Sequence, residues 1–176
     1  MLLQFENLTI RNATVEDAEL LATWWNDGKI MAHAGFPNGT GETEESIASR
    51  IIQDRDDIHR RLIIELDNVP IGEMNYCNVG DKTAELGIKI CDFSKQDKGY
   101  GKILLSMLLG ELFNNMGYEK AILDTNFKNV RAQHVYEQLG FKKVQIRENS
   151  WYNQLGEVQS SIDYELGSSE FVNFAK

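Results

Sequence analysis

The sequence has 176 residues, of which 18 are basic and 27 acidic, and its formal net charge is −9 at pH 7. This length suits one domain, and a hydrophobic content of 42% is enough for a substantial core. Such an acidic chain is a poor match for nucleic acid or an anionic membrane, because phosphate groups repel it. We therefore expect one domain over residues 1–176, with its core at about 8–166 and a short tail at 167–176.

The charges are distributed unevenly along the chain. Residues 95–147 contain 9 Lys or Arg and 5 Asp or Glu, a net charge of +4, whereas the remainder carries −13. This asymmetry predicts that the basic segment binds an anionic ligand and that a cationic ligand binds elsewhere.

The sequence carries no signal for export or membrane insertion. No apolar run approaches the ~20 residues that cross a bilayer, and the first residues lack the basic and apolar regions of a signal peptide. Cys77 and Cys91 are the only cysteines, too few for a disulfide framework and without the paired spacing of zinc ligands. We expect a cytoplasmic protein with free thiols and no bound metal.

The first third of the chain predicts a strand, a helix and a loop. The strand covers 8–11, and Thr14 and Asp17 match a capping box for the helix that follows. Gly28 is the expected end of this helix. The segment 34–41 is rich in glycine and contains a proline, so it predicts a loop.

A helix and three strands are predicted next. The helix is polar and runs from about 43 to 59, with Ile58 on its apolar stripe. The three strands form an antiparallel meander in which Cys77 lies opposite Glu85. They cover 62–66, 71–79 and 84–90.

The second half of the chain begins with a helix that is apolar nearly all round. It starts at Gly99 and ends at Gly117, and its composition predicts deep burial. A short strand at 121–123 and a helix at 129–138 follow, then two strands at 141–146 and 160–166. The fold class is therefore α/β (α+β): a mixed, mainly antiparallel central sheet flanked by helices.

The loop before the apolar helix has the composition of an anion site. Its glycines let the backbone approach a ligand, and the helix N-terminus adds free N–H groups and a partial positive charge. It is not a P-loop, because the pattern G-x-x-x-x-G-K-S/T is absent. It is not the dinucleotide fingerprint either, because Leu104 stands where the third glycine is needed. A tight helix start would use the same glycines, but the neighbouring lysines favour a phosphate ligand. The residues are Lys95, Gln96, Asp97, Lys98, Gly99, Tyr100, Gly101 and Lys102.

Two segments resemble a known family. The pattern Gln-x-x-Gly-x-Gly at 96–101 resembles the acetyl-CoA signature of the GNAT superfamily of N-acetyltransferases. The segments Asn-Val-Arg-Ala at 129–132 and Tyr-Glu-Gln-Leu-Gly-Phe at 136–141 are similar to its second cofactor segment. The predicted order of strands and helices also agrees with the GNAT fold.

The resemblance extends from about 8 to 166. Residues 84–87 and the hairpin at 151–164 resemble the branch that contains ribosomal-protein N-terminal acetyltransferases and spermidine acetyltransferases. Gln96 is a departure, since many relatives carry Arg there and a Gln contact is less charged.

The resemblance implies transfer of an acetyl group from acetyl-CoA to a primary amine by direct attack on the thioester. The glycine loop would hold the pyrophosphate, and main-chain groups would pair with the pantetheine arm as an added strand does. Asn129 would bond the same arm, although it also suits a helix N-cap. The implied cofactor contacts are Ile88, Ile90, Gln96, Asp97, Lys98, Gly99, Tyr100, Gly101, Lys102 and Asn129.

Tyr136 is the candidate general acid. A phenol has a pKa near ~10 and a thiol near ~8.5, so a positioned phenol can donate a proton to the departing thiolate. Its alternative role is packing beside Leu139 and Phe141.

Glu85 is the candidate general base, acting through water. It shares a strand face with Gly87, which is expected to leave room for a substrate, and with Lys89. Its alternative role is a surface charge paired with Lys89. Asp92 and His33 are further candidates for the base, and some relatives use none.

The acceptor is expected at the first helix and the loop after it, where relatives form this site. Trp24, Trp25, His33 and Phe36 lie there, and for each of them core packing is the alternative. The acidic remainder of the chain suits a cationic acceptor such as a polyamine, an aminoglycoside or a protein N-terminus.

Several alternatives stay open. One is a non-catalytic acyl-CoA-binding module, another an acyltransferase that uses a different acyl-CoA donor, and a third a structural protein with this fold. A homodimer through the terminal strands also stays open.

Overall fold

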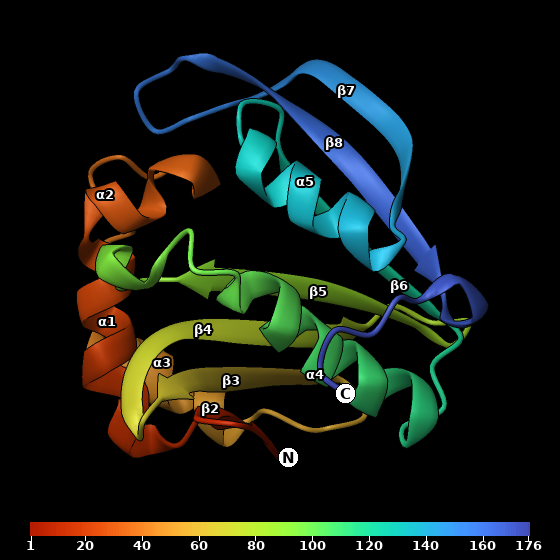
Figure 1. Cartoon of the computed structure of the whole chain (residues 1–176). Coiled ribbons are helices and arrows are strands. Elements are labelled where there is room, and N and C mark those ends of the chain that lie inside the picture. Colours follow the sequence, from red (N-terminus) through yellow and green to blue (C-terminus); the bar gives the residue numbers. More distant parts are fainter.

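The computed structural model describes residues 1–176 as one eight-stranded sheet with helices on both faces (Figure 1). The strand order is β1-β2-β3-β4-β5-β6-β8-β7, and only the β5–β6 pair is parallel. This architecture confirms the predicted fold class. The strands are β1 Leu2–Phe5, β2 Leu8–Asn12, β3 His59–Leu66, β4 Val69–Asn78, β5 Thr83–Ile90, β6 Lys120–Asn126, β7 Lys142–Tyr152 and β8 Val158–Gly167.

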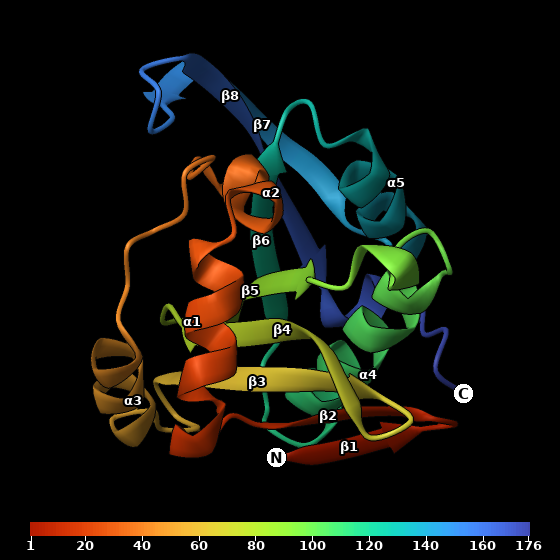
Figure 2. The same ribbon diagram turned by 90° about the vertical axis from the view of Figure 1, so that its left-hand side faces the viewer.

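The helices form two groups on opposite faces of the sheet (Figure 2). The first group, α1 and α3, packs on one face, and α4 and α5 cover the other. None of the helices combines the length and the apolar character that a membrane crossing requires. The helices are α1 Ala18–Asn26, α2 Gly28–Met31, α3 Glu44–Ile52, α4 Tyr100–Asn114 and α5 Val130–Leu139.

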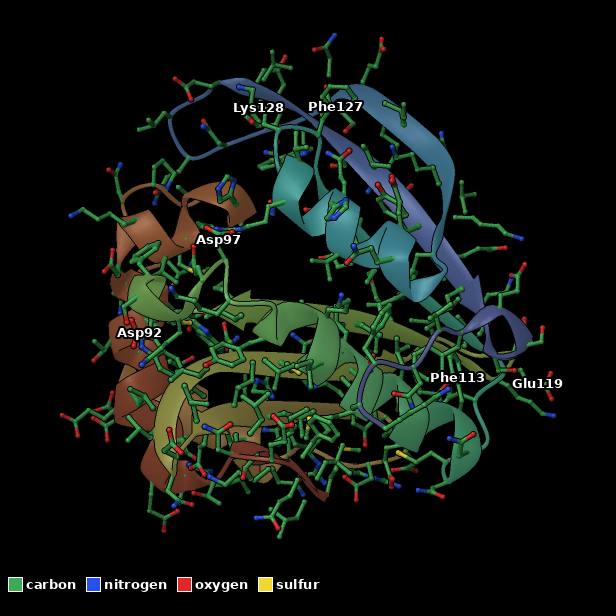
Figure 3. All side chains as sticks on the ribbon, viewed as in Figure 1. Asp92, Asp97, Phe113, Glu119, Phe127 and Lys128 are labelled. Atoms are coloured by element: carbon green, nitrogen blue, oxygen red, sulfur yellow. The ribbon has the colours of Figure 1, made fainter.

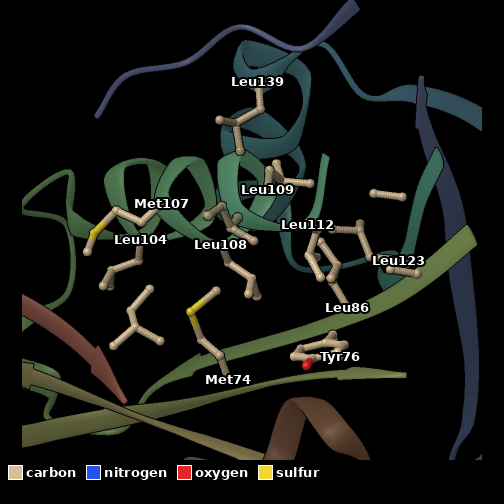
Figure 4. Close-up of a cluster of buried hydrophobic side chains, with 14 of the residues drawn as sticks. Met74, Tyr76, Leu86, Leu104, Met107, Leu108, Leu109, Leu112, Leu123 and Leu139 are labelled. Atoms are coloured by element: carbon tan, nitrogen blue, oxygen red, sulfur yellow. The ribbon is translucent and has the colours of Figure 1, made fainter. Parts of the chain in front are cut away.

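The larger hydrophobic core lies between α4 and the sheet (Figure 4). Leu104, Leu108 and Leu112 of α4 are fully buried in one cluster with Met74 and Tyr76 of β4. The predicted burial of this apolar helix is therefore confirmed. The cluster between α1, α3 and β3 has only six buried residues, so the opposite face of the sheet is covered more thinly.

The polar helix is shorter than predicted: α3 ends at Ile52 and does not continue to His59. The carboxylate of Asp54 accepts a hydrogen bond from the main-chain N–H of Arg61 at 2.9 Å and also binds its guanidinium group. Such side-chain bonds to the backbone compete with helix continuation. As a result Ile58, which was predicted on the apolar stripe, is 51% exposed.

The N-terminal hairpin was not predicted. Strand β1 pairs with β2, with Leu3 opposite Ile10, through a turn at Glu6 and Asn7. Glu6 has a φ of 52°, a conformation that other residue types adopt more readily, so it gives little sequence signal for the turn. Gly28 is a second correction: α1 already ends at Asn26, and Gly28 begins α2.

Further local predictions can be compared with the structure. The apolar helix ends at Asn114, before the predicted Gly117, and the strand predicted at 121–123 is longer, Lys120–Asn126. The last two strands form as predicted but are longer: β7 continues to Tyr152, and β8 extends beyond the predicted range at both ends.

Thr14 and Asp17 form the expected capping box, which opens a 3₁₀ turn before α1. Cys77 lies opposite Glu85 in the β4–β5 register, and both cysteines are free.

Candidate active site

The parallel strands β5 and β6 pair only over Thr83–Glu85 of β5. After Glu85 the two strands diverge. Beyond this point one edge of β5 has no partner strand. The N–H of Cys91 donates to the carbonyl of Ile71 in β4 at 2.8 Å, so main-chain groups of odd-numbered residues face β4. Those of Ile88 and Ile90 therefore face the open edge, where an extended ligand arm can pair with them.

A cavity of about 480 Å³ lies at this divergence. It is bounded by β5, the loop between β5 and α4, the first turns of α4, and α5, and α2 closes one end. Most of the predicted site residues meet here. These are Ile88, Ile90, Gln96, Asp97, Gly99, Tyr100, Gly101, Lys102, Asn129, Tyr136 and His33.

Helix α4 begins at this cavity without a side-chain cap. Gly99 precedes it with a φ of 82°, a left-handed conformation that glycine adopts without strain. The first N–H groups of the 15-residue helix therefore have no side-chain acceptor, and Tyr100, Gly101 and Lys102 line the cavity. Free N–H groups with the positive end of the helix dipole form a site that suits a phosphate.

The cavity lining is strongly basic. Asp97 is its only carboxylate, and it lies in the loop before α4 (Figure 3). A guanidinium nitrogen of Arg131 on α5 lies 3.3 Å from this carboxylate, so an ion pair links the loop to α5. The ammonium group of Lys102 lies 4.2 Å from the ring centre of Phe174. The cationic side chains of the lining are Lys29, Lys89, Lys95, Lys102 and Arg131.

Gln96, where many relatives have Arg, fastens the loop to the sheet. Its side-chain amide donates to the carbonyl of Ile90 at 2.8 Å. The side chain of Asn129 also bonds to the backbone: its oxygen accepts a hydrogen bond from the N–H of Ala132 at 3.2 Å and caps the N-terminus of α5. Both residues line the cavity while they hold its walls.

Tyr136 lies on α5 and is 7% exposed. Its ring packs against those of Phe141 and Tyr164, with centroids 5.9 and 5.6 Å away. Burial, with a smaller contribution from the charge of Asp124, raises the pKa of Tyr136 to about 12. The phenol therefore keeps its proton at neutral pH. The ring packs in the core, which was the alternative role, and the residue also lines the cavity.

Six predicted residues do not line the cavity: Glu85, Asp92, Lys98, Trp24, Trp25 and Phe36. The indole N–H of Trp25 donates to both carboxylate oxygens of Glu73 on β4, at 2.8 and 2.9 Å. Lys98, Glu85 and Phe36 are exposed.

The surroundings of Glu85 differ from the prediction. Lys89 pairs with Glu73 at 3.2 Å and not with Glu85. The space beside Gly87 is filled, since a Cβ atom there would lie 2.6 Å from the side-chain amide of Asn75. Gly87 thus accommodates Asn75 on the neighbouring strand and leaves no room for a substrate.

Three cationic residues of the lining were not assigned to the site from the sequence: Lys29, Lys89 and Arg131. Arg131 lies inside the second motif, so proximity to that motif was the available signal. Lys29 reaches the cavity from α2, and no local pattern indicates that.

The family model of the acetyltransferase (GNAT) domain matches residues 7–142. The chain belongs to the GNAT acetyltransferase family. The resemblance of its two glycine-containing segments to this family is therefore confirmed. The chain is also 29% identical over 146 residues to an uncharacterized protein of Methanocaldococcus jannaschii. That match covers 82% of the chain and spans about 30% of the relative's length.

Solved structures have the same fold as this acetyltransferase. A spermidine N-acetyltransferase from Vibrio cholerae, in complex with CoA and spermine, superimposes with a TM-score of 0.84 and 22% identity. The match covers 95% of this chain and 99% of the Vibrio cholerae enzyme. A ribosomal L7/L12 alpha-N-protein acetyltransferase in complex with coenzyme A superimposes with a TM-score of 0.82 and 15% identity. This match covers 95% of this chain and 98% of the ribosomal-protein acetyltransferase.

Proposed function

We propose that this GNAT acetyltransferase transfers an acetyl group from acetyl-CoA to a primary amine. The observation that carries the proposal is the cavity that lies between β5, the start of α4 and α5, beyond the point where β6 leaves β5. It combines an uncapped helix N-terminus, five cationic side chains and the buried Tyr136. The basic end suits the phosphates of CoA, and the open edge of β5 suits its extended pantetheine arm.

The proposed reaction is a direct attack. The amine nitrogen forms a bond to the thioester carbonyl carbon, and the resulting oxyanion accepts a hydrogen bond from a main-chain N–H of β5, for which Ile88 is the candidate. When the C–S bond breaks, Tyr136 donates its proton to the departing thiolate sulfur. The proton lost by the amine passes to a base through water.

Glu85 is our proposed base, and its exposed position is compatible with transfer through water. Asp92 is a weaker candidate, because hydrogen bonds from the hydroxyl and the N–H of Ser94 hold its pKa below the usual range. His33 lines the cavity and stays an alternative. The structure adds Asp124 of β6, whose charge acts on Tyr136.

We propose a cationic amine as the acceptor class. A primary amine arrives as an ammonium ion at neutral pH, and the exposed carboxylate of Glu85 on β5 can attract it. The Vibrio cholerae structure with spermine supports an acceptor of this kind. The nearby carboxylates of Asp124 on β6 and Asp163 on β8 are already paired with the guanidinium group of Arg147, at 3.2 and 2.7 Å.

Release of CoA thiol from acetyl-CoA, followed across polyamines, aminoglycosides and peptides with free N-termini, tests the proposal. We expect amine-dependent release from at least one acceptor class. CoA binding without release from any amine would instead support the non-catalytic module. Faster release from another acyl-CoA would support a different donor.

Affinity for CoA should fall as salt rises, because the basic lining binds phosphates. Raising NaCl from about 50 to about 500 mM shortens the Debye length from roughly 14 to roughly 4 Å. We expect calorimetry to show at least about a tenfold weaker Kd for CoA. Pantetheine, which lacks phosphates, is the matched control and should be unaffected. Equal salt dependence of both ligands would argue against this electrostatic account.

Glu85→Gln should lower turnover at neutral pH about tenfold and shift the acidic limb of the pH–rate profile, because the amide cannot accept the amine proton. Asp124→Asn is the comparison variant. An acidic limb that moves only in Asp124→Asn would assign the base to Asp124.

A further inference from the structure

The turn of the β7–β8 hairpin lies against the loop that follows α2, as both ribbon views show (Figures 1 and 2). Gln154 at this turn makes three hydrogen bonds to that loop. Its main-chain N–H donates to the carbonyl of Gly35 at 2.8 Å. Its side-chain oxygen accepts from the N–H of Asn38 at 2.9 Å, and its side-chain nitrogen donates to the carbonyl of Gly39 at 3.0 Å. Both halves of the side-chain amide are thus used on one loop.

A second contact lies beside the first. A Cβ atom at Gly35 would lie 2.5 Å from the ring of Trp151, so the indole is pressed against the backbone of the loop. The indole N–H donates to the hydroxyl of Ser161 on β8 at 2.9 Å, which fixes the ring to the sheet. We call the contacts of Gln154 and Trp151 with residues 35–39 the clasp.

The clasp holds a segment that adjoins the cavity. His33 lies two residues before Gly35 and lines the cavity, and Phe36 lies between the points that the clasp binds. The other end of the loop is held by α1, since the N–H of Thr40 donates to the carbonyl of Trp25 at 2.9 Å. The loop is therefore fixed from two sides, by α1 and by the distant hairpin.

We propose that Gln154 is a positioning residue that fixes the acceptor wall of the cavity. The inference rests on the proposed function, because it concerns the wall that an amine acceptor would contact. With the clasp closed, the wall that Lys29, Ile30 and His33 form is preorganised, and an acceptor binds without first ordering it. Without the clasp the wall has many conformations, and binding must select one of them.

Gln154→Ala tests this role. We expect the KM of the acceptor to rise about tenfold, a change that the loss of two side-chain hydrogen bonds can produce. The kcat should change less than about twofold and the Kd of CoA should stay the same, since Gln154 touches neither Tyr136 nor the glycine loop. Gln154→Glu keeps the oxygen that accepts from Asn38 but loses the donor to Gly39, so its effect should be intermediate.

Ser150→Ala is the matched control. Its hydroxyl donates to the carbonyl of Arg147 in the same hairpin and makes no contact with the loop. Hydrogen exchange provides a readout that needs no acceptor: amides of residues 35–41 should exchange faster in Gln154→Ala than in the wild type, and at the wild-type rate in Ser150→Ala.

The outcomes separate the two proposals. Unchanged exchange, or faster exchange with an unchanged acceptor KM in an active enzyme, overturns the positioning role. A wild-type protein that releases no thiol with any amine overturns the proposed function, and accelerated loop exchange in Gln154→Ala would then support the clasp alone.

Discussion

Replacing Tyr136 by Phe is expected to lower kcat about 100-fold, the smaller end of what a positioned general acid contributes. The substitution removes the proton donor for the thiolate but keeps the ring that packs against Phe141 and Tyr164. Because the pKa of Tyr136 is raised to about 12, the phenol stays protonated over the whole neutral range. The wild-type rate should therefore show no alkaline decline from this residue below about pH 11.

Steady-state turnover and calorimetry with CoA give the two measurements, and the Kd of CoA should change less than about twofold. Tyr164→Phe is the control: it removes a hydroxyl that bonds to Glu137 at 3.2 Å, on a residue that does not line the cavity. Equal losses of turnover in the two variants, or none in Tyr136→Phe, would remove Tyr136 as the acid.

Gly101→Asp is expected to weaken CoA binding about 100-fold. A Cβ atom at Gly101 meets no atom within 4 Å and the backbone needs no positive φ, so the fold should tolerate the side chain. The new carboxylate would lie at the helix N-terminus that is proposed to hold the pyrophosphate. Two like charges about 4 Å apart repel by up to ~4 kcal/mol at an effective dielectric constant of 20, and a 100-fold loss corresponds to about 2.7 kcal/mol.

Calorimetry of CoA binding measures this effect, with thermal unfolding as a check on the fold. Gly110→Asp supplies the same charge in the middle of α4, away from the cavity lining, and should leave the Kd within about twofold. Gly101→Ala should give a smaller loss than Gly101→Asp. Wild-type affinity in Gly101→Asp would mean that the glycine loop serves only as a tight start of the helix.

Elements whose ends are marked by local signals could be predicted from the sequence. Helix α5 is an example: Asn129 caps its start, and Gly140 with a φ of 100° ends it, as expected. The glycine-rich helix start that is proposed as an anion site could also be located from the sequence, because the glycines, the lysines and the helix start lie within eight residues of one another. These features are formed by residues that are close together in the sequence, so the local sequence pattern is enough to predict them.

Features that depend on distant partners could not be predicted. The end of α3 depends on Asp54 and its bonds to Arg61. The space beside Gly87 is filled by Asn75 of the neighbouring strand. The bond between Gln154 and Asn38 joins residues 116 positions apart. Nothing in the sequence around either residue indicates the other, because their proximity results from the packing of the whole sheet.

The short pairing of β5 with β6 has a consequence for stability. It divides the sheet into two halves, β1–β5 and β6–β8, which are joined within the sheet only by the three residue pairs between β5 and β6. A coenzyme arm that bonds to the free edge of β5 while its phosphates contact α4 and α5 would bridge these halves. The free energy of unfolding then depends on the coenzyme concentration. At 100 times the Kd, bound coenzyme adds about 2.7 kcal/mol to it, and without coenzyme only the short β5–β6 pairing joins the two halves of the sheet.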